Sequence, residues 1–266
     1  MTDIVVTGIG PVSAVGIGHA GWIAGLAACG GNAPARDTAG ALPTVPINDF
    51  NLDSILPSSK TYLDRAAAFT LAAGQLALTD ADLLGQGARW RSGVVLGTEY
   101  GCLATMQLFT SALQQKGARL ANPLLFSQMY VNTPASLAAI EFGLGGHHGA
   151  FTGRNAGTQA LESATEALLL GRAEVIVAIG VDVISEPLAR ALSAENALHG
   201  AALGEGACAL VLETTTHATA RTAIGTPLDD LRRTALPDLR RQLGYTFAAE
   251  PFFQLAAAYA TLCCHS

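Results

Sequence analysis

The chain has 266 residues, half of them hydrophobic, and only 14% are charged, against about 25% in a typical soluble protein. The formal net charge is −6 and the 15 Lys and Arg residues are scattered, which argues against nucleic-acid binding, since that needs a contiguous basic footprint. Because so few charges are available to cover a surface, we expect much of it to be buried against another protein; an Ala- and Gly-rich α/β core is the alternative.

The predicted elements alternate between strands and helices along most of the chain. Residues 4–6 predict a buried strand, residues 8–13 a turn and residues 18–26 a helix, whereas residues 28–60 are rich in Gly and Pro and predict an irregular surface loop. Later strands are predicted at 93–97, 148–153, 174–179 and 207–212, and helices at 63–78, 103–115, 122–143 (a turn, then a helix punctuated at Pro134) and 158–170. This alternation predicts an α/β fold whose parallel or mixed sheet is covered on both faces.

Neither a signal peptide nor a membrane span is expected. Asp3 precedes the first apolar run, and no apolar stretch reaches the ~20 uninterrupted residues that a spanning helix requires. Five cysteines without a CxxC pair indicate reduced, mostly buried thiols in a cytoplasmic protein, with the last two near a frayed or docking end: Cys29, Cys102, Cys208, Cys263 and Cys264.

The sequence predicts no metal and no cofactor. His147 and His148 have no Cys, Asp or Glu at ligand spacing, so we expect them in a turn before a strand. Gly8-Ile-Gly is followed by Pro rather than by a helix, so it is not a dinucleotide fingerprint. Two basic pairs, at 232–233 and 240–241, have a spacing that suits one solvated helix face.

Residues 149–161, Gly-Ala-Phe-Thr-Gly-Arg-Asn-Ala-Gly-Thr-Gln-Ala-Leu, predict a strand, a tight turn and a helix start. This turn resembles the nucleophile turn of β-ketoacyl synthases, the condensing enzymes of the thiolase superfamily. Matching landmarks occur in the same order, at Val5-Val-Thr-Gly-Ile-Gly, Leu63-Asp-Arg-Ala-Ala-Ala-Phe, Gly93-Val-Val-Leu-Gly-Thr, Gly171-Arg-Ala-Glu-Val-Ile-Val-Ala-Ile-Gly and Leu203-Gly-Glu-Gly-Ala-Cys-Ala-Leu-Val-Leu-Glu. The resemblance implies a thiolase-like layered αβα fold, with residues 1–213 as its N-terminal domain and 214–266 as a remnant of its C-terminal domain.

The departures from the family concern its catalytic residues. Arg154 stands where the family has its cysteine, and a guanidinium is no nucleophile. Tyr245 stands where the family has its second catalytic histidine, while the segment with the first histidine and the terminal glycine-phenylalanine loop find no match. Arg154 would fill the pocket or pair with a carboxylate; alternatively, Asn155 takes the cysteine's place and Arg154 lies in solvent. Neither alternative supplies a nucleophile.

Relatives without the cysteine include chain-length factors, inactive subunits that pair with an active synthase in type II polyketide and aryl-polyene systems. The resemblance therefore implies a non-catalytic subunit that forms a heterodimer with an active β-ketoacyl synthase, meets acyl carrier protein through that complex and closes the acyl tunnel. The family pairs the strand at 148–153 across its two-fold axis, which places Phe151 at the interface. The other tunnel or interface candidates are Tyr100, Leu124, Leu125, Phe126, Met129 and Tyr130.

Three alternatives stay open. Leu124, Leu125, Phe126 and Met129 are as consistent with ordinary core residues as with a tunnel. The chain as a whole could be a scaffold that stabilises a synthase without touching substrate, or an acyltransferase or hydrolase with an unorthodox nucleophile. Cys102 and Cys208 are poor candidates for that nucleophile, because both flank apolar strands and glycine turns and are expected in the core.

Overall fold

The computed structural model describes residues 3–28, 37–39, 42–57, 62–85, 91–234 and 239–263. Cys29 and Cys264 lie outside these residues. Among the described helices none is both long and apolar enough to cross a membrane.

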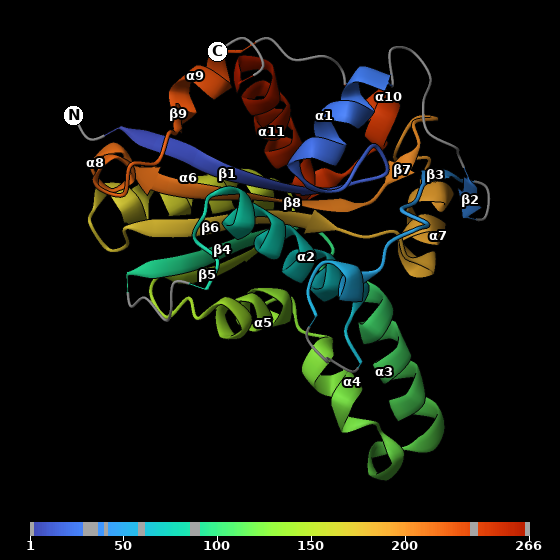
Figure 1. The fold of residues 1–266 in the computed structure, drawn as a ribbon. Helices are drawn as coiled ribbons and strands as arrows, with labels where there is room; N and C mark the ends of the chain where they lie inside the picture. The colour runs from blue at the N-terminus through green and yellow to red at the C-terminus, as the bar shows by residue number, and fades with distance from the viewer. Residues whose placement is uncertain are drawn as a thin grey trace.

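A six-stranded mixed sheet forms the centre of the fold, in the order β5-β4-β6-β8-β1-β9 (Figure 1). Its strands are β1 (Ile4–Val12), β4 (Ser92–Thr98), β5 (His148–Thr152), β6 (Val175–Asp182), β8 (Gly206–Thr214) and β9 (Thr226–Pro227). β4 pairs parallel with both β5 and β6, whereas β8 and β9 join antiparallel. The predicted mixed α/β sheet is confirmed, and β5 is an edge strand of the described sheet.

The turn predicted at residues 8–13 is wrong, because β1 continues through this segment with an irregularity between Val6 and Gly8. The glycines there serve close packing instead of a turn. A Cβ on Gly10 would collide with the carbonyl oxygen of Ala73 in α2 (Arg65–Asp80), which crosses the strand at this point. Asp80, at the end of α2, accepts the N–H of Ile9 at 2.8 Å and fixes the irregular strand.

Helices cover both faces of the sheet, as predicted. α2 and α5 (Thr133–Phe142) pack on one face, and α6 (Ala156–Leu169) and α11 (Glu250–Cys263) pack on the other. α1 (Gly18–Ala28) lies against α11, where the ring of Trp22 stacks on that of Phe253 with centroids 5.4 Å apart. Ala is the most frequent buried residue of these helices, and such small side chains let the layers approach closely.

The surface loop predicted for residues 28–60 is only partly correct. The described part of this segment contains β2 (Asp37–Ala39), β3 (Leu42–Val45) and the 3₁₀ turn η1 (Leu52–Ser54). β3 pairs with β7 (Leu203–Gly204) in a small second sheet, and Val45, Ile47 and Leu56 are buried. Glu205 holds this segment in place, because its carboxylate accepts the N–H of Ile47 and pairs with Arg65.

α3 (Leu103–Lys116) and α4 (Pro123–Gln128), joined through the 3₁₀ turn η2 (Ala118–Leu120), project away from the sheet (Figure 1). The single helix expected within 122–143 is two, and Pro134 lies in the first turn of the second, α5, where a missing N–H costs nothing. Several large apolar side chains on the projection and on α5 are exposed: Met106, Leu108, Leu113, Leu120, Leu124, Phe126, Tyr130 and Ile140.

The remaining elements are short: α7 (Glu186–Ala194), α8 (Thr215–Ala220), α9 (Leu228–Arg233), α10 (Arg240–Leu243) and the 3₁₀ turn η3 (Phe247–Ala249). The expectation that the two basic pairs share one helix face is wrong, since they belong to separate helices, α9 and α10. Arg240 instead pairs with Glu250 of α11 at 2.7 Å. The domain boundary at 213/214 stays a prediction.

Candidate functional site

The turn between β5 and α6 has an unusual backbone. Asn155, which precedes the first residue of α6, lies in the left-handed region with φ 66° and ψ 13°, and its side chain makes no capping hydrogen bond. Gly157, in the first turn, faces the carbonyl oxygen of Ala248 so closely that a Cβ would collide with it. The start of α6 is thereby packed tightly against η3, and Arg154 precedes the helix at this junction.

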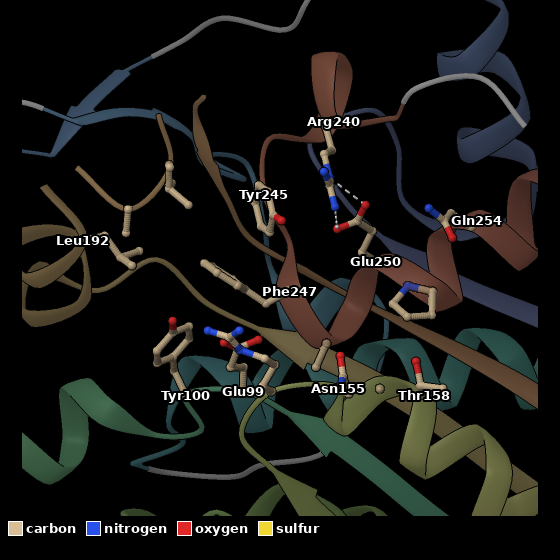
Figure 2. A pocket seen from close by; sticks show the side chains of 16 residues that line it. Glu99, Tyr100, Asn155, Thr158, Leu192, Arg240, Tyr245, Phe247, Glu250 and Gln254 are labelled. Carbon is tan, nitrogen blue, oxygen red and sulfur yellow. Dashed lines mark hydrogen bonds and ion pairs between the residues drawn. The ribbon is translucent and has the colours of Figure 1, made fainter. Parts of the chain in front are cut away.

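A cavity of about 540 Å³ opens beside this turn (Figure 2). Four segments far apart in sequence form its wall: the end of β4, the β5–α6 turn, α7 with its following loop, and the chain from α10 to α11. Its lining residues include Glu99, Tyr100, Arg154, Asn155, Thr158, Leu192, Leu198, Arg240, Tyr245, Phe247, Glu250 and Gln254. Three of the predicted site residues, Tyr100, Arg154 and Tyr245, therefore meet at one cavity.

One wall of the cavity is aromatic. The ring of Phe247 lies 4.9 Å from that of Tyr100, nearly perpendicular to it, and 5.2 Å from that of Tyr245 (Figure 2). The guanidinium of Arg240 lies 4.3 Å above the Tyr245 ring while it also pairs with Glu250. This arrangement fixes the Tyr245 ring on the cavity wall.

Beneath the cavity lies Asp182, the last residue of β6, whose side chain is fully buried. Its carboxyl oxygens accept hydrogen bonds from the Thr98 hydroxyl at 3.0 Å and from the N–H groups of Glu99, Tyr100 and Ala248 at 3.1, 3.0 and 2.9 Å. Burial raises the pKa of Asp182 to about 7, although these four donors act in the opposite direction.

The phenol of Tyr100 is also shifted. Burial, and then the negative charges of Glu99 and Asp182, raise its pKa to about 12, while the nearby guanidinium of Arg154 acts in the opposite direction. A hydrogen bond to the Glu99 side chain acts in the same direction as burial, so Tyr100 is neutral at physiological pH.

The chemistry of the lining is polar and aromatic. Among the described residues around the cavity there is neither a cysteine nor a histidine. Cys102 and Cys208 are buried, as expected, and burial raises the pKa of both thiols. His147 precedes β5, as expected, whereas His148 is the first residue of that strand and not part of a turn. The Nε2 of His147 lies 3.3 Å from the hydroxyl of Ser163. Within the described chain no three His, Cys, Asp or Glu side chains gather to hold a metal ion.

The other predicted residues do not line this cavity. Leu124, Leu125, Phe126, Met129 and Tyr130 lie on or just after α4. Leu124 and Phe126 are exposed, so for these two the alternative of an ordinary core position is wrong. Phe151 is half-buried on β5 and packs against the core on the α6 side of the sheet.

Sequence reasoning missed Asp182, Phe247 and Arg240. The signal for Asp182 was an acidic residue that ends an apolar run, since parallel strands carry functional groups at their carboxyl ends. No sequence pattern marks the other two as site residues. Phe247 stands out in the structure by its backbone φ of 45°, and Arg240 by its tertiary contacts.

Residues 27–218, most of the chain, match the family model described as the N-terminal domain of beta-ketoacyl synthase. The chain belongs to the beta-ketoacyl synthase family. The predicted thiolase-like αβα fold is thus confirmed. A putative mitochondrial 3-oxoacyl-[acyl-carrier-protein] synthase of Schizosaccharomyces pombe is 31% identical over 191 residues, which cover 60% of this chain and 44% of that synthase. The chain thus spans about half the length of such curated relatives.

Solved synthase structures superimpose on most of the chain. A beta-ketoacyl synthase from Burkholderia phymatum aligns with a TM-score of 0.75 at 26% identity, covering 85% of this chain and 62% of the other. The ishigamide ketosynthase/chain length factor aligns with a TM-score of 0.71 at 21% identity, covering 84% of this chain and 61% of the other. At that identity the second likeness shows the fold alone.

Proposed function

We propose that the chain is a catalytically inactive, chain-length-factor-like subunit that pairs with an active β-ketoacyl synthase and shapes the acyl tunnel during polyketide or aryl-polyene elongation. The observation that carries this proposal is Arg154. It lies at the β5–α6 turn, beside the cavity that Tyr245 also lines, so both departures from the catalytic pattern lie at the same place.

A condensing site needs a thiolate that holds the acyl chain and imidazoles that stabilise the enolate formed on decarboxylation. Arg154 has no electron pair to attack a thioester, and Tyr245, a phenol whose ring lies under the Arg240 guanidinium, does not replace an imidazole. The described lining of the cavity supplies no replacement from Cys or His. A subunit of this kind contributes shape to a complex rather than chemistry.

Two surfaces support a synthase partner. β5 has no neighbour on its outer side in the described sheet, and exposed polar backbone of this kind readily pairs with another strand. The projection of α3 and α4 exposes the apolar side chains of Leu108, Leu124 and Phe126. A partner synthase would cover both surfaces, and acyl carrier protein would reach the chain through that complex. The ishigamide ketosynthase/chain length factor, which shares this fold, is by its name a pair of this kind.

The test is to locate the acyl group. The chain is co-purified with an active synthase, incubated with an acylated carrier protein, and each subunit is weighed by mass spectrometry. We expect an acyl adduct on the synthase alone. Arg154→Ala should leave condensation by the complex within a fewfold of wild type, and Arg154→Cys should gain no adduct that turns over. Arg233→Ala, in an exposed pair with Asp230, is the matched control for loss of an arginine.

An acyl adduct on the wild-type chain would instead establish an acyltransferase with an unorthodox nucleophile, in keeping with the synthase names of its relatives. Condensation by Arg154→Cys at this site would also overturn the proposal. A scaffold without contact to substrate gives the same adduct pattern as a chain-length factor and is separated from it by the length of the product.

A further inference from the structure

Asp182 connects the two segments that meet in the aromatic wall of the cavity, the end of β4 and η3. On one side, the end of β4 donates three groups to its carboxyl oxygens, namely the Thr98 hydroxyl and the N–H groups of Glu99 and Tyr100. On the other side, the N–H of Ala248 in η3 donates to Oδ2 at 2.9 Å. The Thr98 hydroxyl extends the connection by accepting the N–H of Gly101 at 2.9 Å.

The two connected segments carry the aromatic wall. Tyr100 is itself one of the donors, and Phe247 directly precedes another, Ala248. The edge-on contact of the two rings at 4.9 Å therefore depends on backbone that is anchored to the same carboxyl group. Since three of the four donors are main-chain amides, the connection depends on the Asp182 carboxyl group and not on the residue types at positions 99, 100 and 248.

We propose that Asp182 is a positioning residue of the cavity, whose carboxyl group holds Tyr100 against Phe247 in the aromatic wall. The assignment concerns the geometry of the site and holds whether or not an acyl chain enters the cavity.

The protonation state of Asp182 supplies a readout that packing alone would not change. Burial raises its pKa to about 7, from an ordinary value near 4 that an opening to water would restore. Between these two pH values, a local opening that exposes Asp182 to water releases one proton. The equilibrium constant for this opening therefore rises about tenfold for each unit by which the pH increases. The segments around Asp182 carry other charged or titratable side chains, and none of these accepts a hydrogen bond from the amides of Glu99, Tyr100 or Ala248. These side chains are Glu99, Tyr100, Arg154, Glu205 (paired with Arg65) and Glu250 (paired with Arg240).

The experiment is amide hydrogen exchange of the chain at pH 5 to 8.5, with rates corrected for their intrinsic pH dependence. We expect the protection of the Glu99, Tyr100 and Ala248 amides to fall about tenfold per pH unit up to pH 7 and then to level off. Amides that bond only within the projection, such as those of Gly117 and Phe126, should show no such slope. The variant Glu99→Gln removes a neighbouring charge and should keep the slope.

Asp182→Asn should lower the protection of the three amides, abolish the slope and remove the nuclear Overhauser contact between the Tyr100 and Phe247 rings. A flat profile in the wild type would overturn the proposal, as would unchanged protection in Asp182→Asn. If this variant does not fold, the wild-type profile with its Glu99→Gln control decides. The readout uses no synthase or substrate, so its failure is distinct from a failure of the proposed function.

Discussion

The ring of Phe247 meets that of Tyr100 edge-on, with centroids 4.9 Å apart and planes at 81°. To reach this position Phe247 adopts φ 45°, a left-handed conformation that is costly for a bulky residue. The backbone therefore stores strain at the centre of the cavity wall, and this strain can be measured.

Phe247→Ala and Phe247→Gly both remove the ring, and each should lose the ~0.5–1.5 kcal/mol of an aromatic pair. Only glycine also relieves the backbone. We expect the Gly variant to be more stable than the Ala variant by ~0.5–1 kcal/mol in urea denaturation. At an unstrained position the order would be reversed, so a more stable Ala variant would show that the left-handed backbone carries no cost.

Reducing Tyr100 to Ala should lengthen the product of the assembled complex by at least one two-carbon unit, if the cavity is part of the acyl tunnel. Each added methylene gains ~0.8 kcal/mol on burial while room remains, whereas overfilling costs ~1–3 kcal/mol. The measurement is the mass distribution of acyl chains released from the carrier protein.

Leu125 and Met129 provide an independent test, because both are half-buried around α4 and neither lines the cavity. Leu125→Ala and Met129→Gly should lengthen the product if the partner's tunnel ends against α4, and Leu125→Trp should shorten it. Ile224→Ala, at a largely exposed position beyond α8, is the control. Unchanged product from every variant that assembles identifies a scaffold.

Ala150→Pro should abolish the complex and spare the fold. The N–H of Val94 bonds to the carbonyl of His147 and that of Gly153 to the carbonyl of Thr98, so odd-numbered residues of β5 face β4. The N–H of Ala150 therefore points outward, where an edge strand tolerates proline. Co-purification with the synthase and circular dichroism measure the two effects. A complex that survives this change would show that β5 is not the shared edge.

Phe151 is a poorer place for that test. Because its ring packs against the core beside α6, a charged substitution there would destabilise the chain itself as well as any interface.

Arg221→Met should destabilise the chain by ~3–5 kcal/mol at pH 7, since it leaves the fully buried carboxylate of Glu213 without its bidentate partner. Arg233→Met, which breaks an exposed pair with Asp230, should cost no more than ~0.5 kcal/mol. Urea denaturation of the two variants makes the comparison.

The pH dependence of this loss has a definite sign. Arg221, Thr7 and His217 lower the pKa of Glu213 despite its burial, so the network stabilises the fold above the ordinary pKa of a glutamate and this stability is lost as the pH falls through the lower folded value. The difference in the free energy of unfolding between Arg221→Met and wild type should therefore shrink in acid. An equal difference at pH 3 and pH 7 would exclude an electrostatic origin.

Local patterns predicted most of the sheet and its covering helices, because buried parallel strands such as β4 and β6 are continuous apolar runs. The turn predicted at Gly8–Ser13 failed since glycine indicates both turns and close packing, and only the position of Ala73 distinguishes them. The small sheet of β3 and β7 joins residues about 160 apart, beyond the reach of any periodicity.

At the site, the alignment of one turn located Arg154 and Tyr245, which the fold brings to one cavity. The support beneath them could not be predicted in this way. Asp182 accepts hydrogen bonds from main-chain amides. Because nearly every residue type has such an amide, the residues that donate carry no recognisable sequence pattern.

The pairing of β1 with β8 has a consequence for synthesis. Thr7 of β1 donates a hydrogen bond to Glu213 of β8, 206 residues further along the chain. During synthesis β1 is therefore made well before β8, and must wait until the residues between them have been added. Until then a long apolar strand stays unpaired, so we expect the nascent chain to expose a segment that is prone to aggregation.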